Sequence, residues 1–348
     1  MGFEGLAYTG TPHDRAADRR GDPGWTADRL ARADTRVIPL WRDRCLLSSD
    51  GTPVDLAGAA AQAVAGESEQ VALLGLDGPR TVFTADLSHL SEADAVRLGN
   101  AESTADVRRL AAALPLPEAA TLAYARGVLY WNRHQRFCGS CGAPTIGRSA
   151  GHVRACSAAG CGREHFPRIE PAVIVLVESP EPPARCLLAR HHGAGPDGFS
   201  LLAGFVEIGE SLEGAVRREL AEEAGVAVGE VTYRGSQGWP FPAGLMVGFF
   251  AKALDERIEV DGNELREARW FTREQLVERI VAGPGSGPSD SIGGRLMRSW
   301  AGLDAGVPDV VGPDSGVLDV ARPDAGGLGP AGVPAQVGSR FKSSSQVD

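Results

Sequence analysis

The fold is decided by one stretch of the sequence, Gly204-Phe-Val-Glu-Ile-Gly-Glu-Ser-Leu-Glu-Gly-Ala-Val-Arg-Arg-Glu-Leu-Ala-Glu-Glu-Ala-Gly-Val226. Ser211 is a suitable N-cap and Gly225 is a natural C-terminal stop, so the stretch predicts a helix between these residues. Three carboxylates at positions i, i+3 and i+4 would project from one face of this helix; they belong to Glu219, Glu222 and Glu223. Because like charges repel, this arrangement favours a hard divalent cation such as Mg²⁺ or Mn²⁺, which prefers oxygen ligands.

The simplest alternative is an acidic helix face in solvent. The stretch nevertheless resembles the Nudix box, in which Gly, five residues, Glu, seven residues, Arg-Glu-aliphatic, one residue, Glu-Glu, one residue and Gly-aliphatic follow in order. These positions are filled by Gly204, Glu210, Arg218, Glu219, Leu220, Glu222, Glu223, Gly225 and Val226. So many constrained positions at fixed spacing favour the motif over a chance match.

Length and composition are those of an ordinary soluble protein. The 348 residues suggest two or three domains, and 43% hydrophobic with 23% charged residues is typical of globular chains. No apolar run approaches the roughly 20 residues of a membrane helix, so no membrane partner is expected. Charged residues near the start, such as Asp14 and Arg15, have no apolar core behind them, which argues against a secretory signal and predicts a cytoplasmic protein. The net charge of −10 argues against a broad basic surface for nucleic acid.

Composition and pattern also predict the domain organisation. We expect a flexible leader at 1–30, an amino-terminal domain at 31–135, a cysteine-rich segment at 136–168, a catalytic domain at 169–301 and a disordered Pro- and Gly-rich tail at 302–348. Strands are predicted at 37–41, 71–76 and 81–86, and a helix is predicted at 118–134. A buried strand at 171–177 and a returning strand at 186–190 are predicted before the acidic stretch.

Two cysteine pairs predict a structural metal site. Each pair lies beside a glycine, as in a four-thiolate zinc ribbon; the pairs are Cys138 with Cys141, and Cys156 with Cys161. Two disulfides are the alternative, which the absence of a secretory signal disfavours. His152 and His165 are nearby and could compete as ligands, but we favour the cysteines. Four thiolates leave no open position, so one structural Zn²⁺ per chain is expected.

An aromatic loop follows the acidic stretch. It reads Ser236-Gln-Gly-Trp-Pro-Phe-Pro-Ala-Gly244, in which two prolines restrict the backbone and two aromatic residues provide flat apolar faces. Such a loop can stack on a planar ring of a ligand. A hydrophobic plug stiffened by proline is an equally good interpretation of the loop alone.

The order of zinc ribbon, strand, Nudix box and Ser-Gln-x-Trp-Pro-Phe-Pro loop resembles the NADH pyrophosphatase branch of the Nudix hydrolases. The likeness extends over roughly residues 36 to 300, including a small amino-terminal Nudix-like domain. The pattern of that branch has Pro where this chain has Gly238, and Ser where it has Gly244. The first change is expected to loosen the loop, and the second removes a hydroxyl group.

The resemblance implies an α+β fold, with a Nudix α/β/α sandwich, an amino-terminal Nudix-like domain and a zinc ribbon with four cysteines. It implies a homodimer whose active sites use both subunits. The metal ligands that it implies are Glu219, Glu222, Glu223, Glu264 and the backbone carbonyl of Ala203. Glu219, Glu222 and Glu223 would be catalytic, whereas Gly204, Glu210, Arg218 and Gly225 would be structural. The implied substrate-binding residues are Phe166 (from the partner subunit), Phe205, Gln237, Gly238, Trp239, Pro240, Phe241, Pro242, Ala243 and Gly244.

The reaction that the resemblance implies is hydrolysis of the pyrophosphate bond of NADH or NAD⁺ with Mg²⁺ or Mn²⁺, and removal of NAD caps from the 5′ ends of RNA is a second expected activity. Three alternatives stay open at this point. They are a Nudix enzyme for ADP-ribose or a nucleoside triphosphate, a non-catalytic sensor of NAD-type ligands, and a zinc-ribbon protein that binds nucleic acid. The intact carboxylates argue against the sensor, and the scarcity of aromatic residues around the ribbon argues against the third alternative.

Overall fold

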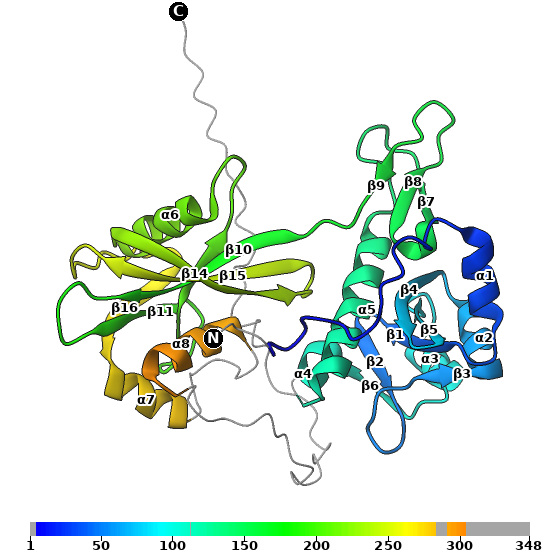
Figure 1. Ribbon diagram of the computed structural model, residues 1–348, viewed down its shortest axis with the longest axis horizontal. Coiled ribbons are helices and arrows are strands. Elements are labelled where there is room, and N and C mark those ends of the chain that lie inside the picture. Colours follow the sequence, from blue (N-terminus) through cyan, green and yellow to red (C-terminus); the bar gives the residue numbers. More distant parts are fainter. Residues whose placement is uncertain (1–4, 112, 283–290, 304–348) are drawn as a thin grey trace, which may run out of the picture. The chain divides into compact units, whose positions relative to one another are not determined.

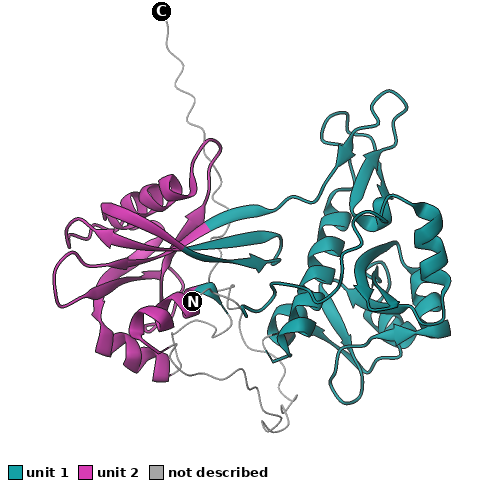
Figure 2. Cartoon of the chain, in the orientation of Figure 1, with its two compact units in different colours: residues 1–172, 234–248, 290–292 teal, residues 173–233, 249–289, 293–348 magenta. Residues whose placement is uncertain are grey.

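The computed structural model describes residues 5–111, 113–282 and 291–303 (Figure 1). They form two compact units, which Figure 2 shows in different colours. The first unit includes residues up to 172 together with 234–248, and the second is formed mainly by 173–233 and 249–282. The tail beyond residue 303, for which disorder is predicted, lies outside the described residues.

The amino-terminal part of the first unit is built on a six-stranded sheet in the order β4-β5-β1-β2-β6, with β3 paired to β1. Its strands are β1 (Arg36–Trp41), β2 (Arg44–Leu47), β3 (Leu56–Ala57), β4 (Gln70–Asp77), β5 (Arg80–Asp86) and β6 (Ser103–Asp106). Its helices are α1 (Pro23–Ala31), α2 (Gly58–Glu67), α3 (Glu92–Leu98), α4 (Val107–Ala111) and α5 (Leu116–His134). The predicted strands and the predicted helix at 118–134 are confirmed.

Both faces of this sheet are buried, so alternate residues of each strand belong to different cores. Val37 packs in a cluster with Val64 of α2, whereas Ile38 packs in a second cluster with Leu129 of α5. Helices therefore cover the sheet on its two faces, which makes three layers. β4 and β5 pair antiparallel across the turn that follows Asp77.

The amino-terminal segment differs from the expected flexible leader. Leu6, Ala7 and Tyr8 are buried, and the backbone of Asp14 pairs with Leu76 at the edge of β4 with N···O distances of 3.1 and 2.7 Å. The polar composition of residues 1–30 suggested a solvated chain, but a few apolar residues and one bridge to a sheet edge are enough to anchor it.

The cysteine-rich segment follows α5 and forms a three-stranded antiparallel sheet. Its strands are β7 (Thr145–Arg148), β8 (Val153–Cys156) and β9 (Glu164–His165), in that order, with a short 3₁₀ turn at Ser149–Gly151. β8 is fully buried and carries Cys156 at its end. The sheet thus positions one cysteine, and the other three lie in the turns beside it.

The second sheet has seven strands in the order β12-β11-β10-β15-β14, with β13 paired to β10 and β16 paired to β11. The strands are β10 (Glu170–Glu178), β11 (Arg185–His191), β12 (Phe199–Ser200), β13 (Leu202–Phe205), β14 (Val228–Trp239), β15 (Gly244–Ala253) and β16 (Leu265–Thr272). The helices are α6 (Leu212–Ala224), α7 (Arg273–Ala282) and α8 (Ile292–Ala301). In Figure 1, α6 lies on one side of the sheet, and α7 and α8 lie on the other.

The two strands predicted before the acidic stretch are confirmed as β10 and β11, and the α+β class is confirmed with them. Val175, Leu176 and Val177 of β10 are buried, as expected of a central strand with helices on both faces. Within the described residues, no helix combines the length and the apolar character needed to cross a membrane.

Candidate active site

The acidic stretch forms the predicted helix, α6, with the predicted ends. The Ser211 side chain accepts a hydrogen bond from the backbone N–H of Gly214 at 3.0 Å, which caps the first turn. Gly225 follows the last turn with φ of +64°, in the left-handed region that glycine adopts without strain. The next N–H, of Val226, donates back to the carbonyl of Leu220 at 3.0 Å, which ends the helix.

Gly204, at the end of β13, lies against the carboxylate of Glu219. A Cβ on Gly204 would lie 1.9 Å from the Glu219 Cδ and 1.9 Å from its Oε1. A larger residue here would displace the Glu219 carboxylate, so glycine allows the close approach of this carboxylate to the backbone. Ala203, whose carbonyl is a predicted metal ligand, directly precedes Gly204 in β13.

Arg218 holds the loop before α6 onto the helix. Its guanidinium donates to both carboxylate oxygens of Glu210, at 2.7 and 2.9 Å, and to the carbonyl of Phe205 at 2.8 Å. It also donates to Glu222 at 3.1 Å. The hydrogen bonds from Arg218 lower the pKa of Glu210 to about 2, so Glu210 stays ionised. These bonds pair Arg218 with two carboxylates of the box, Glu210 and Glu222.

Glu223 is the most deeply buried carboxylate of the helix. Its residue is 5% exposed, and its Oε2 has no hydrogen-bond partner. Burial raises its pKa to about 8, and the negative charges of Glu219, Glu264 and Asp261 add to the effect. Burial likewise raises the pKa of Glu219. A buried, unpartnered carboxylate among other carboxylates is the arrangement that a cation would stabilise.

Glu264 is positioned by the turn before β16. The carboxylate of Asp261 accepts hydrogen bonds from the backbone N–H groups of Glu264, at 3.0 Å, and Leu265, at 3.1 Å. The backbone N–H of Asp261 donates in turn to the carbonyl of Glu223, at 3.1 Å. Sequence analysis gave no role to Asp261, although an Asp three residues before a predicted ligand is a recognisable turn signal.

These carboxylates interact within the second unit, and such a group of oxygen atoms would suit a hard divalent cation. Glu219, Glu223 and Glu264 act on one another electrostatically, and Glu222 joins them through its charge. The four cysteine sulfurs described next all lie within 4.8 Å of one another. No other group of possible ligands in the described part of the chain, these carboxylates included, is so compact. A cation bridging the carboxylates would offset their repulsion.

The four predicted cysteines lie together at one end of the three-stranded sheet. The sulfurs of Cys138 and Cys161 are 3.8 Å apart, and those of Cys141 and Cys156 are 3.4 Å apart. A disulfide has a sulfur–sulfur distance near 2.05 Å, and all four cysteines are free, so the disulfide alternative is excluded for this structure. The cluster has the ligand type and number of a structural zinc site.

The surroundings of Cys138 favour its thiolate form, whereas the pKa of Cys156 is raised to about 12. The backbone N–H of Ser140 donates to the sulfur of Cys138 at 3.4 Å, and this bond is the largest cause that lowers the pKa of Cys138 to about 5. His152 lies elsewhere, because its ring nitrogen contacts the carbonyl of Leu73 at 2.8 Å. His165 does interact with Cys138, and its hydrogen bond also lowers the pKa of that cysteine. The compact set of possible ligands nevertheless consists of the four cysteines, as predicted.

The predicted aromatic loop belongs to the first unit, where its side chains contact other residues of the same chain. Gln237 is fully buried, and its side chain joins the carbonyl of Ala7 to the backbone N–H of Ile292. The Trp239 ring is 7% exposed. By contrast, the rings of Phe166 and Phe205 are exposed, as residues that bind a ligand or a partner can be.

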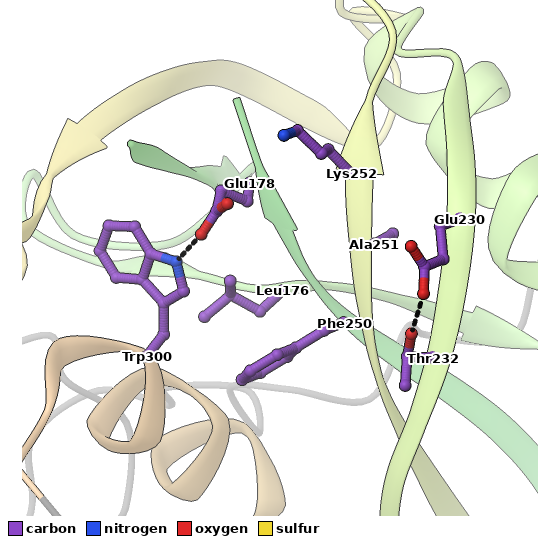
Figure 3. A pocket seen from close by; sticks show the side chains of 8 residues that line it. All are labelled: Leu176, Glu178, Glu230, Thr232, Phe250, Ala251, Lys252 and Trp300. Atoms are coloured by element: carbon purple, nitrogen blue, oxygen red, sulfur yellow. Dashed lines mark hydrogen bonds between the residues drawn. The ribbon is translucent and has the colours of Figure 1, made fainter. Parts of the chain in front are cut away.

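A shallow pocket of about 170 Å³ lies elsewhere in the second unit (Figure 3). Trp300 of α8 and Glu178 of β10 flank it, and the indole N–H donates to the Glu178 carboxylate at 2.7 Å. Lys252 of β15 lies at another side of it. None of the clustered carboxylates of α6 lines this pocket, so it is separate from the candidate active site.

Comparison with known proteins agrees with this geometry. Residues 168–288 match the NUDIX domain model, and residues 34–131 match the model of the NADH pyrophosphatase-like rudimentary NUDIX domain. The NAD-capped RNA hydrolase NudC of Mycobacterium tuberculosis is 36% identical over 309 residues, which is 84% of this chain and 93% of the relative. The chain belongs to the Nudix hydrolase family. Within this family it has the NADH pyrophosphatase-like domain arrangement.

Two further comparisons describe the extent of the similarity. The human NAD-capped RNA hydrolase NUDT12 is 42% identical over 193 residues, which is 53% of this chain. The matched region is 42% of NUDT12, so this chain spans less than half the length of that Nudix relative. A NUDIX hydrolase of known structure from Nitrosomonas europaea is 27% identical, with a TM-score of 0.34 over 40% of this chain and 80% of that one.

Proposed function

We propose that this Nudix protein hydrolyses the pyrophosphate bond of NADH and NAD⁺, giving AMP and nicotinamide mononucleotide, and that it also removes NAD caps from RNA 5′ ends. The observation that carries the proposal is the buried Glu223 carboxylate, whose Oε2 lacks a partner, on the same helix as Glu219. The names of the relatives, which are NAD-capped RNA hydrolases, support the choice of substrate.

The carboxylates of α6 would hold Mg²⁺ or Mn²⁺ together with Glu264 and the carbonyl of Ala203. Bound divalent cations neutralise the charge of a pyrophosphate and lower the pKa of bound water. Glu223 would lose its proton from the carboxyl group when a cation binds, since its pKa of about 8 keeps it protonated at neutral pH otherwise. Arg218 would keep the Glu210 loop against the helix, and Glu222 would orient a water molecule.

Further parts of the proposal concern the rest of the chain. The four cysteines would bind one structural Zn²⁺. Phe205, the partner subunit's Phe166 and the loop from Gln237 to Gly244 would bind the dinucleotide in a cytoplasmic homodimer. The exposed ring of Phe166, 57% accessible, supports a role in binding, because an isolated chain leaves it uncovered. The domain boundaries at 31–135, 136–168 and 169–301 are part of the same proposal.

The test is release of AMP from NADH, NAD⁺, ADP-ribose and an NAD-capped RNA oligonucleotide, with Mg²⁺ or Mn²⁺ and with EDTA. We expect metal-dependent AMP release from NADH, and loss of at least 100-fold in the Glu223→Gln variant. Glu213→Gln is the matched control, because Glu213 is an exposed glutamate in the first turn of the same helix. Cleavage of ADP-ribose alone would overturn the choice of substrate, and full activity of Glu223→Gln would overturn the proposed site.

A further inference from the structure

The aromatic loop is held by the amino-terminal segment of its own chain. The Tyr8 ring meets the rings of Trp239 and Phe241 edge to face, with centroids 5.4 and 5.1 Å apart. Trp239 and Phe241 also meet each other, at 5.6 Å. Each of these geometries is favourable for aromatic pairs, so the three rings form one compact cluster in the first unit. We call residues 7–9 the tether.

Hydrogen bonds fix the tether to the start of the loop. The Gln237 side chain donates to the carbonyl of Ala7 at 3.0 Å, and the backbone N–H of Gly238 donates to the Thr9 hydroxyl oxygen at 3.0 Å. The second bond depends on an N–H at position 238, which proline would lack. A Cβ at position 238 would lie 3.4 Å from the Tyr8 carbonyl oxygen, so the two backbones run close together here. The expected loosening of the loop by Gly238 is therefore offset by a bond that Gly238 itself donates.

The conformation of Tyr8 indicates that the surrounding contacts determine it. Its φ is +67°, a left-handed value that a bulky residue adopts only when neighbouring structure compensates for the strain. The guanidinium groups of Arg108 and Arg126 lie 5.0 and 5.2 Å from the ring centroids of Trp239 and Phe241. Arg126 also donates to the carbonyl of Pro240 at 2.6 Å, so the tip of the loop is held from a third direction.

We propose that the tether is a specificity element, in which Tyr8 and Thr9 are positioning residues that hold the loop in the shape that selects the nicotinamide half of the dinucleotide. The inference rests on the proposed function and deepens it. Because Trp239 and Gln237 are buried inside the chain, the loop would act through a fixed backbone shape more than through the exposed face of its tryptophan. Loss of the tether should then affect a substrate with nicotinamide more than one without it.

The test compares NADH with ADP-ribose, which lacks nicotinamide, in full-length variants. Thr9→Val removes the acceptor oxygen with little change of shape, Thr9→Ser restores it, and Thr11→Val is the matched control in the same segment. We expect Thr9→Val to raise KM for NADH at least threefold, the size of effect that one hydrogen bond produces, with kcat and the KM for ADP-ribose within about twofold of wild type. Thr9→Ser and Thr11→Val should behave as wild type.

Hydrogen exchange provides a readout that does not depend on turnover. The backbone amide of Gly238 should exchange faster in Thr9→Val than in wild type or Thr11→Val, because it has lost its acceptor. Equal rises in KM for both substrates, or no change in KM and in exchange, would overturn the inference while leaving the proposed function intact. Wild-type protein that releases no AMP from NADH would overturn both.

Discussion

The Glu219 carboxylate lies where a side chain on Gly204 would be, because a Cβ on Gly204 would be 1.9 Å from the Glu219 carboxylate carbon. Gly204→Ala should therefore displace this carboxylate while leaving the capped helix α6 folded. Since a misplacement of about 1 Å at a reacting centre can cost about 100-fold, we expect that loss in AMP release. Steady-state kinetics and thermal unfolding measure the two effects separately. Gly195→Ala is the control, because nothing lies within 4 Å of a Cβ there. A fully active Gly204→Ala protein would contradict the role given to this contact.

Arg218→Lys tests the paired hydrogen bonds to Glu210. Lysine presents a point charge and no planar fork, so it makes one bond where arginine makes two. The pKa of Glu210 is about 2 in the folded chain against 4.5 ordinarily, so its contribution to stability is present above pH 4.5 and is lost as the pH falls toward 2. Urea unfolding at several pH values should show a difference between wild type and Arg218→Lys that shrinks below pH 4.5. Arg217→Lys is the control, since Arg217 bonds to backbone carbonyls. A difference that grows in acid would refute this account.

Cys141→Ser tests the zinc site. We expect purified wild-type protein to contain one zinc ion per chain by elemental mass spectrometry, and the variant to contain less than half as much, because a hydroxyl group is a poor replacement for a thiolate ligand. Chelation should lower the unfolding temperature of wild type and leave that of the variant nearly unchanged. Ser140→Ala, which keeps the N–H that donates to Cys138, should bind zinc normally. Wild-type protein free of zinc after expression in zinc-containing medium would rule the site out.

The environment of His152 predicts that the folded chain loses stability in mild acid. Burial lowers the pKa of His152 from 6.5 to about 4 in the folded chain. Between these two pH values, the histidine is therefore protonated in the unfolded chain but mostly neutral in the folded chain. Its contribution is present above pH 6.5 and falls as the pH drops toward 4. At pH 5 the lost contribution of His152 corresponds to about 2 kcal/mol of unfolding free energy.

His152→Gln keeps a donor for the Leu73 carbonyl without titrating, so the stability of this variant should fall less between pH 7.5 and pH 5. Exposed His134→Gln should keep the wild-type dependence, and an identical slope in His152→Gln would disprove the prediction.

Local signals in the sequence account for the elements that were predicted well. The ends of α6 follow from Ser211 and Gly225, and the helix before the cysteines follows from its apolar spacing, because caps and periodicity act within a few residues. The cysteine cluster was predictable for a similar reason, since ligand type and spacing are visible in the sequence. The carboxylates of the site were identified by a motif with fixed spacing.

Contacts between distant residues account for what the sequence did not reveal. The bonds from Gln237 to Ala7 and from Gly238 to Thr9 join residues 230 and 229 positions apart, and no local pattern reports them. The segment around Tyr8 was consequently assigned to a flexible leader, and the loop was expected to be loosened at Gly238. The bond from the Asp261 N–H to the Glu223 carbonyl is also long-range, whereas the turn that Asp261 forms with Glu264 is a local signal that the sequence analysis did not use.

The end of α6 is bonded to the segment that leads to Glu264. The carbonyls of Ala224 and Glu223 accept from the N–H groups of Glu259 and Asp261, and Asp261 in turn holds the backbone of Glu264. Glu264 is therefore coupled through backbone hydrogen bonds to the end of α6, and a displacement of this helix end would change the position of Glu264 as well.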